Sequence, residues 1–464
     1  MTSTSVFERS VELPVDQASA FAYHDSPGAL QRLLPPWESI EILSTDNQIT
    51  VGSRVRLKAK VCGLPIKYTA KHTVYDPPHH FQDVQEKGPF AGWCHDHRFD
   101  AVSASQSRLT DHLEYRIPLG PLGKLLGSRM ARNQLEAMFR YRHATTRQDL
   151  NLAAAYSLSS QRIGLSGATG LVGQQLQPLL QMLGHQVDSI VRHKADAADE
   201  IAVWDDAFDT AADANLEKLR RLDAVVHLAG KPIAAGRWSE QTKRQIRDSR
   251  VDKTHQLCQR LAALGDDKPQ TLLCASATGI YGDRGDETLD EQSDPGQGFL
   301  ADVAQQWEQA CQPAVDAGIR VVHLRFGMIL SPRGGALQKT LLPAKLGGGR
   351  LGSGRQWWSW IALDDVLGGI YHALATPELH GPVNFVAPQA LTNAQFTAVL
   401  GKVLRRPTIV PAPAFALRLA LGEMADALLL ASARVEPRQL QQTGYAFRFP
   451  DLEAALLHLL GRNS

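Results

Sequence analysis

A glycine-rich heptapeptide near the middle of the chain constrains the fold more than any other feature. Residues 167–173 read Gly-Ala-Thr-Gly-Leu-Val-Gly, between the apolar run 162–166 and the helical pattern 174–183. The first glycine permits a tight turn, the second lets the backbone approach a pyrophosphate, and the third lets the helix pack on the strand. The following helix offers free N–H groups and a positive dipole end to phosphates. The motif predicts a dinucleotide site made by Gly167, Ala168, Thr169, Gly170, Leu171, Val172 and Gly173.

Short apolar runs alternate with helical patterns throughout the segment that contains this loop. Such alternation predicts an α/β domain with a parallel, doubly wound Rossmann sheet and helices on both faces. The expected strands are 162–166, 186–191, 224–228, 271–276, 320–325 and 383–386.

The end of the second expected strand bears on which dinucleotide binds. An acidic residue about 20 residues after the glycine loop would bind the ribose 2′-hydroxyl of NAD. Here the strand runs into Arg192-His193-Lys194. Because a guanidinium suits a 2′-phosphate, we expect NADP, with Arg192 as the discriminating residue.

Other strand ends are expected to meet the cofactor in one crevice, since a doubly wound sheet binds its ligand at the carboxyl ends of its strands. The third strand ends in His227-Leu228-Ala229-Gly230, and the fourth in Ala275-Ser276 before Ala277-Thr278-Gly279-Ile280-Tyr281. The further cofactor-binding candidates are Leu228, Ala229, Gly230, Ala275, Ser276 and Arg325.

The segments on either side differ in pattern. Residues 1–155 combine alternating strand-like runs at 51–61, 66–74 and 108–117 with helical patterns at 15–34, where Asp16 is the expected cap, and at 122–154. We expect an α+β unit with a mostly antiparallel sheet against one long helix. Residues 410–464 are expected to form a small helical domain, which leaves 162–400 as the Rossmann domain.

Several ordered motifs carry a resemblance to known families. GATGLVG, HLAG, SATGIYG, the LRFGMIL run, SPRGGAL and WSWIALDDV resemble the extended short-chain dehydrogenases/reductases, in particular an atypical epimerase-like subfamily of NADP-binding oxidoreductases. The resemblance covers roughly 162–460. Residues 1–155 resemble the START-like (SRPBCC) helix-grip domains, which implies an apolar cavity for a lipid-like or aromatic ligand.

The chain departs from that family's catalytic pattern. The family uses a Tyr-x-x-x-Lys pair, in which the Tyr acts as general acid or base; the matching places hold Phe299 and Val303. Arg250 stands where the family has Asn, and Ala277 where it has a helper hydroxyl. The replacement candidates are Tyr281, Ser276 and Thr278, with Asp302 and Glu308 as further options.

Other side chains allow two interpretations each. Arg355, Trp357, Trp358 and Trp360 either pack in the interior or enclose an anionic or flat substrate. Asp364 and Asp365 are expected to cap the following helix. His95 and His97, two apart on a strand, share one face, which permits a metal; no third ligand is evident from the sequence, so we assign no metal site.

Composition limits the function classes. The 464 residues carry a formal net charge of +1, which does not favour nucleic acid or a polybasic membrane contact. Five scattered cysteines without a CxxC pair argue against a disulfide framework or a zinc site. No apolar run reaches the ~20 residues of a membrane span. The N-terminus lacks a signal-peptide pattern, so we expect a cytoplasmic protein.

These patterns leave three functions open. The first is an NADP-dependent oxidoreductase or epimerase-like enzyme for a small carbonyl or hydroxyl compound, with non-standard proton handling. The second is an NADP-binding sensor or ligand carrier without turnover. In the third, the N-terminal domain delivers a hydrophobic ligand to the NADP site. The motifs do not identify the substrate, the reaction direction or the oligomeric state.

Overall fold

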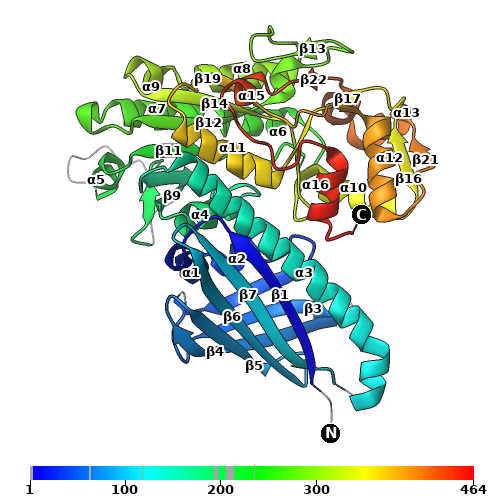
Figure 1. Cartoon of the computed structure of the whole chain (residues 1–464). Helices are drawn as coiled ribbons and strands as arrows, with labels where there is room; N and C mark the ends of the chain where they lie inside the picture. Colours follow the sequence, from blue (N-terminus) through cyan, green and yellow to red (C-terminus); the bar gives the residue numbers. More distant parts are fainter. Residues whose placement is uncertain are drawn as a thin grey trace. The chain divides into compact units, whose positions relative to one another are not determined.

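The computed structural model describes residues 4–46, 48–61, 64–118, 120–192, 197–204, 214–234 and 236–463. The chain divides into two compact units, one built mainly from residues 1–158 and the other mainly from residues 159–457. One unit contains an antiparallel sheet and the other a parallel sheet (Figure 1). The domain boundaries expected from the sequence stay predictions.

The N-terminal unit is a seven-stranded antiparallel sheet in the spatial order β1-β7-β6-β5-β4-β3-β2. Its strands are β1 (Ser5–Leu13), β2 (Ile40–Thr45), β3 (Arg54–Val61), β4 (Leu64–Asp76), β5 (His80–Lys87), β6 (Gly92–Ser103) and β7 (Gln106–Arg116).

One long helix, α3 (Gly120–Tyr156), runs along this sheet (Figure 1). Its apolar side chains Leu135 and Phe139 are buried in a cluster with Phe7, Leu113 and Tyr115 from β1 and β7. The α+β helix-grip arrangement expected from the sequence is therefore confirmed.

The single helix expected at 15–34 is wrong in one respect, because two helices occupy this stretch. They are α1 (Gln17–Asp25) and α2 (Ala29–Leu33). Pro27 favours an extended conformation for Ser26, and Gly28 adopts φ +87°, so the first helix ends there. The Asp16 cap is confirmed, since its carboxylate accepts a hydrogen bond from the Ser19 amide at 3.0 Å.

The second unit contains a seven-stranded parallel sheet in the order β10-β9-β8-β11-β12-β14-β19. The chain order reverses between β8 and β11, which is the switch point where such sheets bind nucleotides. The strands are β8 (Arg162–Ser166), β9 (Gln186–Val191), β10 (Glu200–Ala202), β11 (Ala224–His227), β12 (Thr271–Ala277), β14 (Arg320–Phe326) and β19 (Gly381–Phe385).

Helices connect these strands, as the doubly wound fold requires. They are α4 (Gly173–Met182), α5 (Ala214–Arg220), α6 (Glu240–Asp248), α7 (Val251–Ala262), α8 (Phe299–Gln309), α9 (Gln312–Asp316) and α11 (Leu363–Ala375), with the short 3-10 helices η2 (Gly265–Asp267) and η3 (Thr278–Tyr281). The Rossmann fold class predicted from the sequence is confirmed.

Smaller elements complete the second unit, and the C-terminal part is less purely helical than expected. Strands β21 and β22 each pair with a strand from earlier in the chain, because the segment packs back on this unit. These elements are β13 (Thr288–Leu289), β15 (Met328–Leu330), α10 (Gly335–Lys345), β16 (Gly348–Leu351), β17 (Trp357–Trp358), β18 (Trp360–Ala362), β20 (Leu391–Thr392), α12 (Asn393–Leu404), β21 (Val410–Ala412), α13 (Ala414–Leu421), α14 (Glu423–Ala425), the π-helix η4 (Asp426–Leu430), β22 (Arg434–Val435), α15 (Arg438–Gln442) and α16 (Leu452–Leu459).

Within the described ranges, the helices are all too short or too polar to cross a bilayer. Four cysteines there are free thiols, namely Cys94, Cys258, Cys274 and Cys311, and Cys62 lies outside the described residues.

Candidate functional site

The glycine loop follows β8 and leads directly into α4. Gly167 adopts φ +74°, a conformation that side chains rarely tolerate. A Cβ at Gly173 would collide with the carbonyl oxygen of Gly167, and one at Gly170 would lie 3.2 Å from the same oxygen. The loop is therefore closed so tightly that only glycine fits at its last position.

Ser166 and His227 join the loop to the neighbouring strand end. The Ser166 hydroxyl lies 2.6 Å from His227 Nδ1 and accepts hydrogen bonds from the amides of Leu228 (3.1 Å) and Ala229 (3.3 Å). Thr254 Oγ1 lies 3.0 Å from His227 Nε2. Burial lowers the pKa of His227 to about 4, so the imidazole is neutral at neutral pH. This arrangement brings the predicted Leu228 and Ala229 beside the glycine loop.

Arg250 contacts the turn that follows β11. Its guanidinium donates hydrogen bonds to the carbonyls of Lys231 (2.9 Å) and Ile246 (3.2 Å) and lies 5.0 Å from the centre of the Trp307 ring. A Cβ at Gly230 would lie 3.3 Å from that guanidinium. The arginine thus holds the turn that contains Gly230.

A pocket of about 270 Å³ opens beside the glycine loop. Gly334 belongs to its wall, and a Cβ there would lie 3.1 Å from the Leu171 side chain. The lining residues are Thr169, Leu171, Gln174, Gln175, Arg333, Gly334 and Leu363. Sequence reasoning noted the segment that contains Arg333 only as a family signature and missed its place at the pocket.

Arg192 lies directly after β9, with an exposed side chain. It is not among the residues that line the pocket. Its neighbours 193–196, which include His193 and Lys194, lie outside the described residues. Its position at the carboxyl end of the strand beside β8 is the one expected from the sequence.

A buried polar network lies at the carboxyl ends of β12 and β14, where Ser276 and Arg325 are paired in register. The Ser276 hydroxyl donates to Glu308 Oε1 at 2.7 Å. Arg325 donates to both oxygens of Glu308, each at 2.8 Å. Burial alone would raise the pKa of Glu308, but Arg325 and Ser276 lower it below its usual value. Glu308 is therefore an ionised carboxylate that accepts hydrogen bonds from both Ser276 and Arg325.

Tyr281 extends this network into the core. This side chain is fully buried, and its hydroxyl accepts a hydrogen bond from Arg325 at 2.9 Å. The same hydroxyl can donate to the Asp290 carbonyl (2.9 Å) or to Asn384 Oδ1 (2.8 Å). Burial raises its pKa. All these contacts make Tyr281 a bridge between Arg325 and Asn384.

Thr278 and Ala275 differ in exposure. Thr278 is half-buried, and its hydroxyl donates a long hydrogen bond of 3.3 Å to the Phe326 carbonyl. Ala275 is buried in the core of the sheet. Of the three predicted catalytic candidates, Thr278 is thus the one with a partly accessible side chain.

Three family models match consecutive parts of the chain. Residues 163–386 match the NAD dependent epimerase/dehydratase family, residues 13–139 match polyketide cyclase / dehydrase and lipid transport, and residues 412–459 match a domain of unknown function.

A bacterial relative matches the epimerase-family part of the chain over most of its own length. An epimerase family protein of Mycobacterium bovis is 40% identical over 295 residues, which cover 63% of this chain and 96% of that protein. The chain belongs to the NAD dependent epimerase/dehydratase family. Family membership makes it an NAD(P)-binding protein of the short-chain dehydrogenase/reductase type.

Two solved structures extend the comparison. A nucleoside-diphosphate sugar epimerase from Corynebacterium glutamicum is 30% identical and aligns over 98% of this chain and 90% of its own, with a TM-score of 0.79. The human epimerase family protein SDR39U1, determined with NADPH, is 31% identical over 64% of this chain and 99% of its own, with a TM-score of 0.57. The first alignment includes the N-terminal unit as well as the epimerase-family domain.

Phe299 and Val303 occupy the first turn and a half of α8 in this epimerase-family chain. The Phe299 ring lies 5.2 Å from the ring of Trp238 and 5.3 Å from the ammonium of Lys243, and Val303 is buried. Lys243 was not predicted, because nothing in its local sequence indicates that α6 brings it to Phe299.

Arg355 and the three nearby tryptophans do not share one environment in the structure. Trp360 is fully buried with its Nε1 donating to the Gln389 carbonyl at 2.8 Å, whereas Arg355 is exposed. Trp358 is buried too, and Trp357 donates to Asp286 at 2.7 Å. These observations support the packing interpretation for Trp358 and Trp360.

The expected cap of α11 by Asp365 is wrong. Asp365 instead accepts hydrogen bonds from the amides of Arg448 (2.7 Å) and Phe449 (3.0 Å) and from the Tyr445 hydroxyl (3.0 Å). The helix has no side-chain cap. The carboxylate satisfies amides of a segment eighty residues away, which a local capping rule does not foresee.

Proposed function

We propose that the chain is an NADP-dependent oxidoreductase or epimerase that acts on a small carbonyl or hydroxyl compound. The observation that carries this proposal is the pocket at the glycine loop, with Thr169, Leu171 and Arg333 in its wall. All seven residues of the loop, together with Leu228, Ala229, Gly230 and Ala275, are proposed to form the cofactor cradle.

NADP rather than NAD is proposed because of the charge at the end of β9. Arg192 is exposed there, where an acidic residue would favour the ribose of NAD. The human relative determined with NADPH supports the same choice. Arg333 in the pocket wall adds positive charge suited to the cofactor phosphates.

NADP, when bound, exchanges a hydride with the substrate. We propose that Ser276 and Glu308 handle the proton. In the oxidative direction the Ser276 hydroxyl takes the proton of the substrate hydroxyl as it passes its own proton to Glu308, 2.7 Å away. In the reductive direction the Ser276 hydroxyl gives its proton to the forming alkoxide and regains one from solvent, because Glu308 is ionised. Arg325 orients Glu308, and Tyr281 positions Arg325.

Thr278 stays a second proposed donor, because its side chain is only half-buried. Its hydroxyl and that of Ser276 flank Ala277, which stands where the family has its helper hydroxyl.

The alternative function is an NADP-binding sensor or ligand carrier. Phe299 and Val303 favour it, since neither side chain exchanges protons. The match of residues 13–139 to polyketide cyclase / dehydrase and lipid transport supports a hydrophobic ligand in the N-terminal unit.

The test is turnover by the purified full chain. The substrate panel includes simple carbonyl compounds and nucleoside-diphosphate sugars, the latter because of the Corynebacterium relative. Net NADPH oxidation identifies an oxidoreductase, and inversion of a sugar centre without net loss of cofactor identifies an epimerase. NADPH binding without either reaction would favour the sensor.

The proton path is tested by Ser276→Ala. We expect kcat to fall by about 100-fold or more with NADPH affinity retained, because general acid–base groups contribute about that much. Tyr281→Phe should lower kcat less than Ser276→Ala does, and it should lower the free energy of unfolding more. Ser107→Ala is the matched control, since this buried serine lies in the antiparallel sheet. Unchanged kcat in Ser276→Ala would remove the serine from the mechanism.

A further inference from the structure

A second cluster of chemically active side chains lies inside the antiparallel-sheet unit. Asp83 on β5 is the direct cross-strand partner of His95 on β6, and His97 follows two residues later on the same face. Asp111 on β7 is the partner of His97. His143 reaches the cluster from α3. The two β6 histidines, Asp111 and His143 are all less than 5% exposed.

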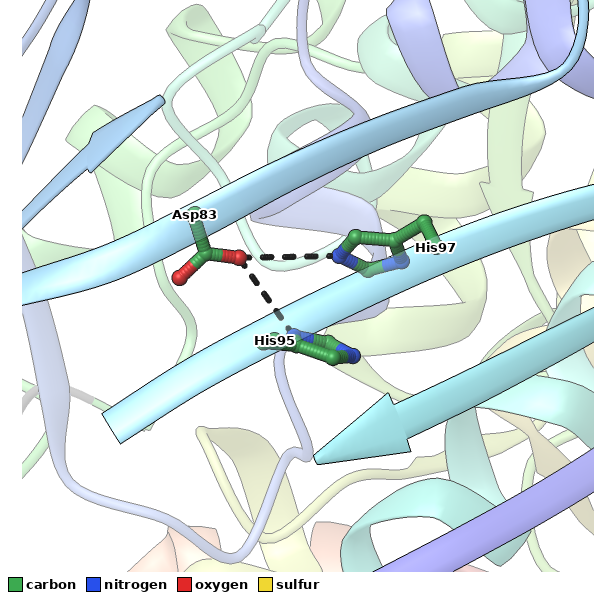
Figure 2. A group of neighbouring side chains, drawn as sticks. All are labelled: Asp83, His95 and His97. Atoms are coloured by element: carbon green, nitrogen blue, oxygen red, sulfur yellow. Dashed lines mark ion pairs between the residues drawn. The ribbon is translucent and has the colours of Figure 1, made fainter. Parts of the chain in front are cut away.

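The spacing around Asp83 is unusual for hydrogen bonding. Its Oδ2 lies 3.4 Å from His95 Nδ1 and 3.7 Å from His97 Nε2, and Figure 2 shows both imidazoles turned toward this carboxylate. An N–H···O hydrogen bond spans about 2.7–3.2 Å. Both separations exceed that range.

The same spacing suits a shared cation. One ligand atom from each of Asp83, His95 and His97 lies within 4.8 Å of the others. A tetrahedral ion with bonds of about 2.0–2.2 Å keeps its ligand atoms roughly 3.3–3.6 Å apart. The two separations from Asp83 Oδ2, 3.4 and 3.7 Å, lie close to that range.

Asp111 contacts the opposite edge of both histidine rings. Asp111 Oδ1 lies 2.9 Å from His95 Nε2 and 2.8 Å from His97 Nδ1, although the second contact lacks hydrogen-bond geometry. Its other oxygen lies 2.5 Å from His143 Nε2. A carboxylate behind ligating imidazoles is the usual means of orienting them and raising their basicity.

We propose that Asp83, His95 and His97 bind one divalent first-row transition-metal ion, with Asp111 as the residue that positions the imidazoles. Two histidines and one carboxylate suit ions of the zinc and iron(II) type rather than Mg²⁺ or Ca²⁺, which prefer oxygen ligands. Three protein ligands leave coordination positions open for water or a substrate. The unit would then be a metal-dependent site rather than only a container for apolar ligands.

The surroundings fit a site that holds its ligands rigidly. The Phe81 ring stacks on His97 with centroids 4.1 Å apart, and the Phe139 ring meets His95 edge-on at 5.3 Å. Two buried nitrogens nearby, Nε1 of Trp93 and Nδ1 of His143, lack a hydrogen-bond partner among the described residues. They provide polar groups for a molecule bound beside the ion.

A metal-free ion network is the competing explanation. Burial alone would lower the pKa of His95, but the carboxylates of Asp111 and Asp83 raise it to about 9, so a proton also balances part of the buried charge. The two explanations differ in stoichiometry, because only the first retains one metal ion per chain.

The experiment uses the full chain purified without a histidine tag, stripped with a chelator and dialysed. Calorimetric titrations with Zn²⁺ and, anaerobically, Fe²⁺ are followed by elemental analysis after gel filtration. Co²⁺ serves as a spectroscopic probe, since its visible d–d bands report ligand geometry. We expect one equivalent of metal per chain with an imidazole-bound Co²⁺ spectrum.

Ligand variants make the assignment specific. Asp83→Asn and His95→Ala should each weaken metal binding at least 100-fold, and Asp111→Asn should weaken it about 10- to 100-fold as an outer-shell change does. His80→Gln is the matched control: His80 lies on β5 too, paired with Asp96 at 2.7 Å on the opposite face of the same strands.

Circular dichroism and NADPH titration accompany each variant, which separates this proposal from the NADP-dependent function. If a ligand variant fails to fold, His97→Gln gives a second, milder test. Substoichiometric metal in the wild-type chain, or affinity unchanged in the folded ligand variants, would overturn the proposal and leave the ion network.

Discussion

At the scale of single residues, His227 links the glycine loop to the core through Ser166 and Thr254. The imidazole is fully buried and its pKa is lowered to about 4 from an ordinary 6.5. A lowered pKa means that the folded state resists protonation, so the neutral ring contributes stability above pH 6.5. That contribution disappears as the pH falls toward 4.

The measurable consequence is acid sensitivity of the parallel-sheet unit. The shift corresponds to about 3 kcal/mol of unfolding free energy. We expect urea titrations of the wild-type chain to show stability falling between pH 6.5 and 4, and the fall to be smaller by about that amount in His227→Gln. His255→Gln, in the adjoining helix α7, is the control. A pH profile that is the same in wild type and His227→Gln would contradict this account.

At the scale of elements, one buried ion pair ties the helices of the N-terminal unit together. Arg32 on α2 donates to Asp149 on α3 through Nε (2.9 Å) and Nη2 (3.0 Å), and Tyr23 on α1 donates to the same carboxylate at 2.9 Å. Both members of the pair are at most 1% exposed. Removing one charge therefore leaves the other in a medium that solvates it poorly.

We expect Asp149→Asn to lower the free energy of unfolding by about 3–5 kcal/mol, the range for a buried pair that loses one partner. Glu136→Gln on the same helix is the matched control, because its pair with Arg9 is 35–40% exposed; it should cost less than about 1 kcal/mol. Chemical denaturation monitored by circular dichroism measures both. Similar losses in the two variants would show that burial does not set the strength of this pair.

The sequence predicts elements whose signals are local. The strands at 162–166 and 186–191 were located to the residue, since apolar runs and turns delimit them. The three-residue β10 was not predicted, because it is too short for any periodicity. The helix over 15–34 was predicted as one piece since its apolar pattern continues across Pro27-Gly28.

The candidate sites likewise differ in whether their residues are consecutive in the sequence or are brought together by the fold. The glycine loop can be recognised from consecutive residues, because its chemistry depends on local backbone geometry. The pairing of Glu308 with Arg325, the approach of Arg333 to the loop and the approach of Asp83 to His95 depend on strand register and loop packing. No spacing in the sequence encodes them.

At the scale of the whole molecule, one chain combines an epimerase-family domain with a unit that matches polyketide cyclase / dehydrase and lipid transport. The proposed NADP site draws all its residues from the first of these. Cofactor binding should therefore stabilise that domain selectively, by about 2.7 kcal/mol at a ligand concentration of 100 times Kd.

Hydrogen exchange with mass spectrometry tests this selectivity. NADPH is expected to slow exchange in peptides that cover residues 162–177, 224–234 and 271–282, and to leave strands β3 to β7 unchanged. Protection of equal size in the antiparallel sheet would indicate that NADPH binds elsewhere or that the two units respond together.

The central claim is that the glycine loop and Arg192 form an NADP site. Isothermal titration of the full chain with NADPH and with NADH tests it most directly. A charge-assisted bond to the 2′-phosphate contributes about 1.5–3 kcal/mol, so NADPH should bind roughly 10- to 100-fold more tightly than NADH. Arg192→Ala should abolish the preference, and Arg221→Ala, an exposed arginine just before the amino end of β11, should keep it. Equal affinities in the wild-type chain, or an undiminished preference in Arg192→Ala, would contradict the assignment.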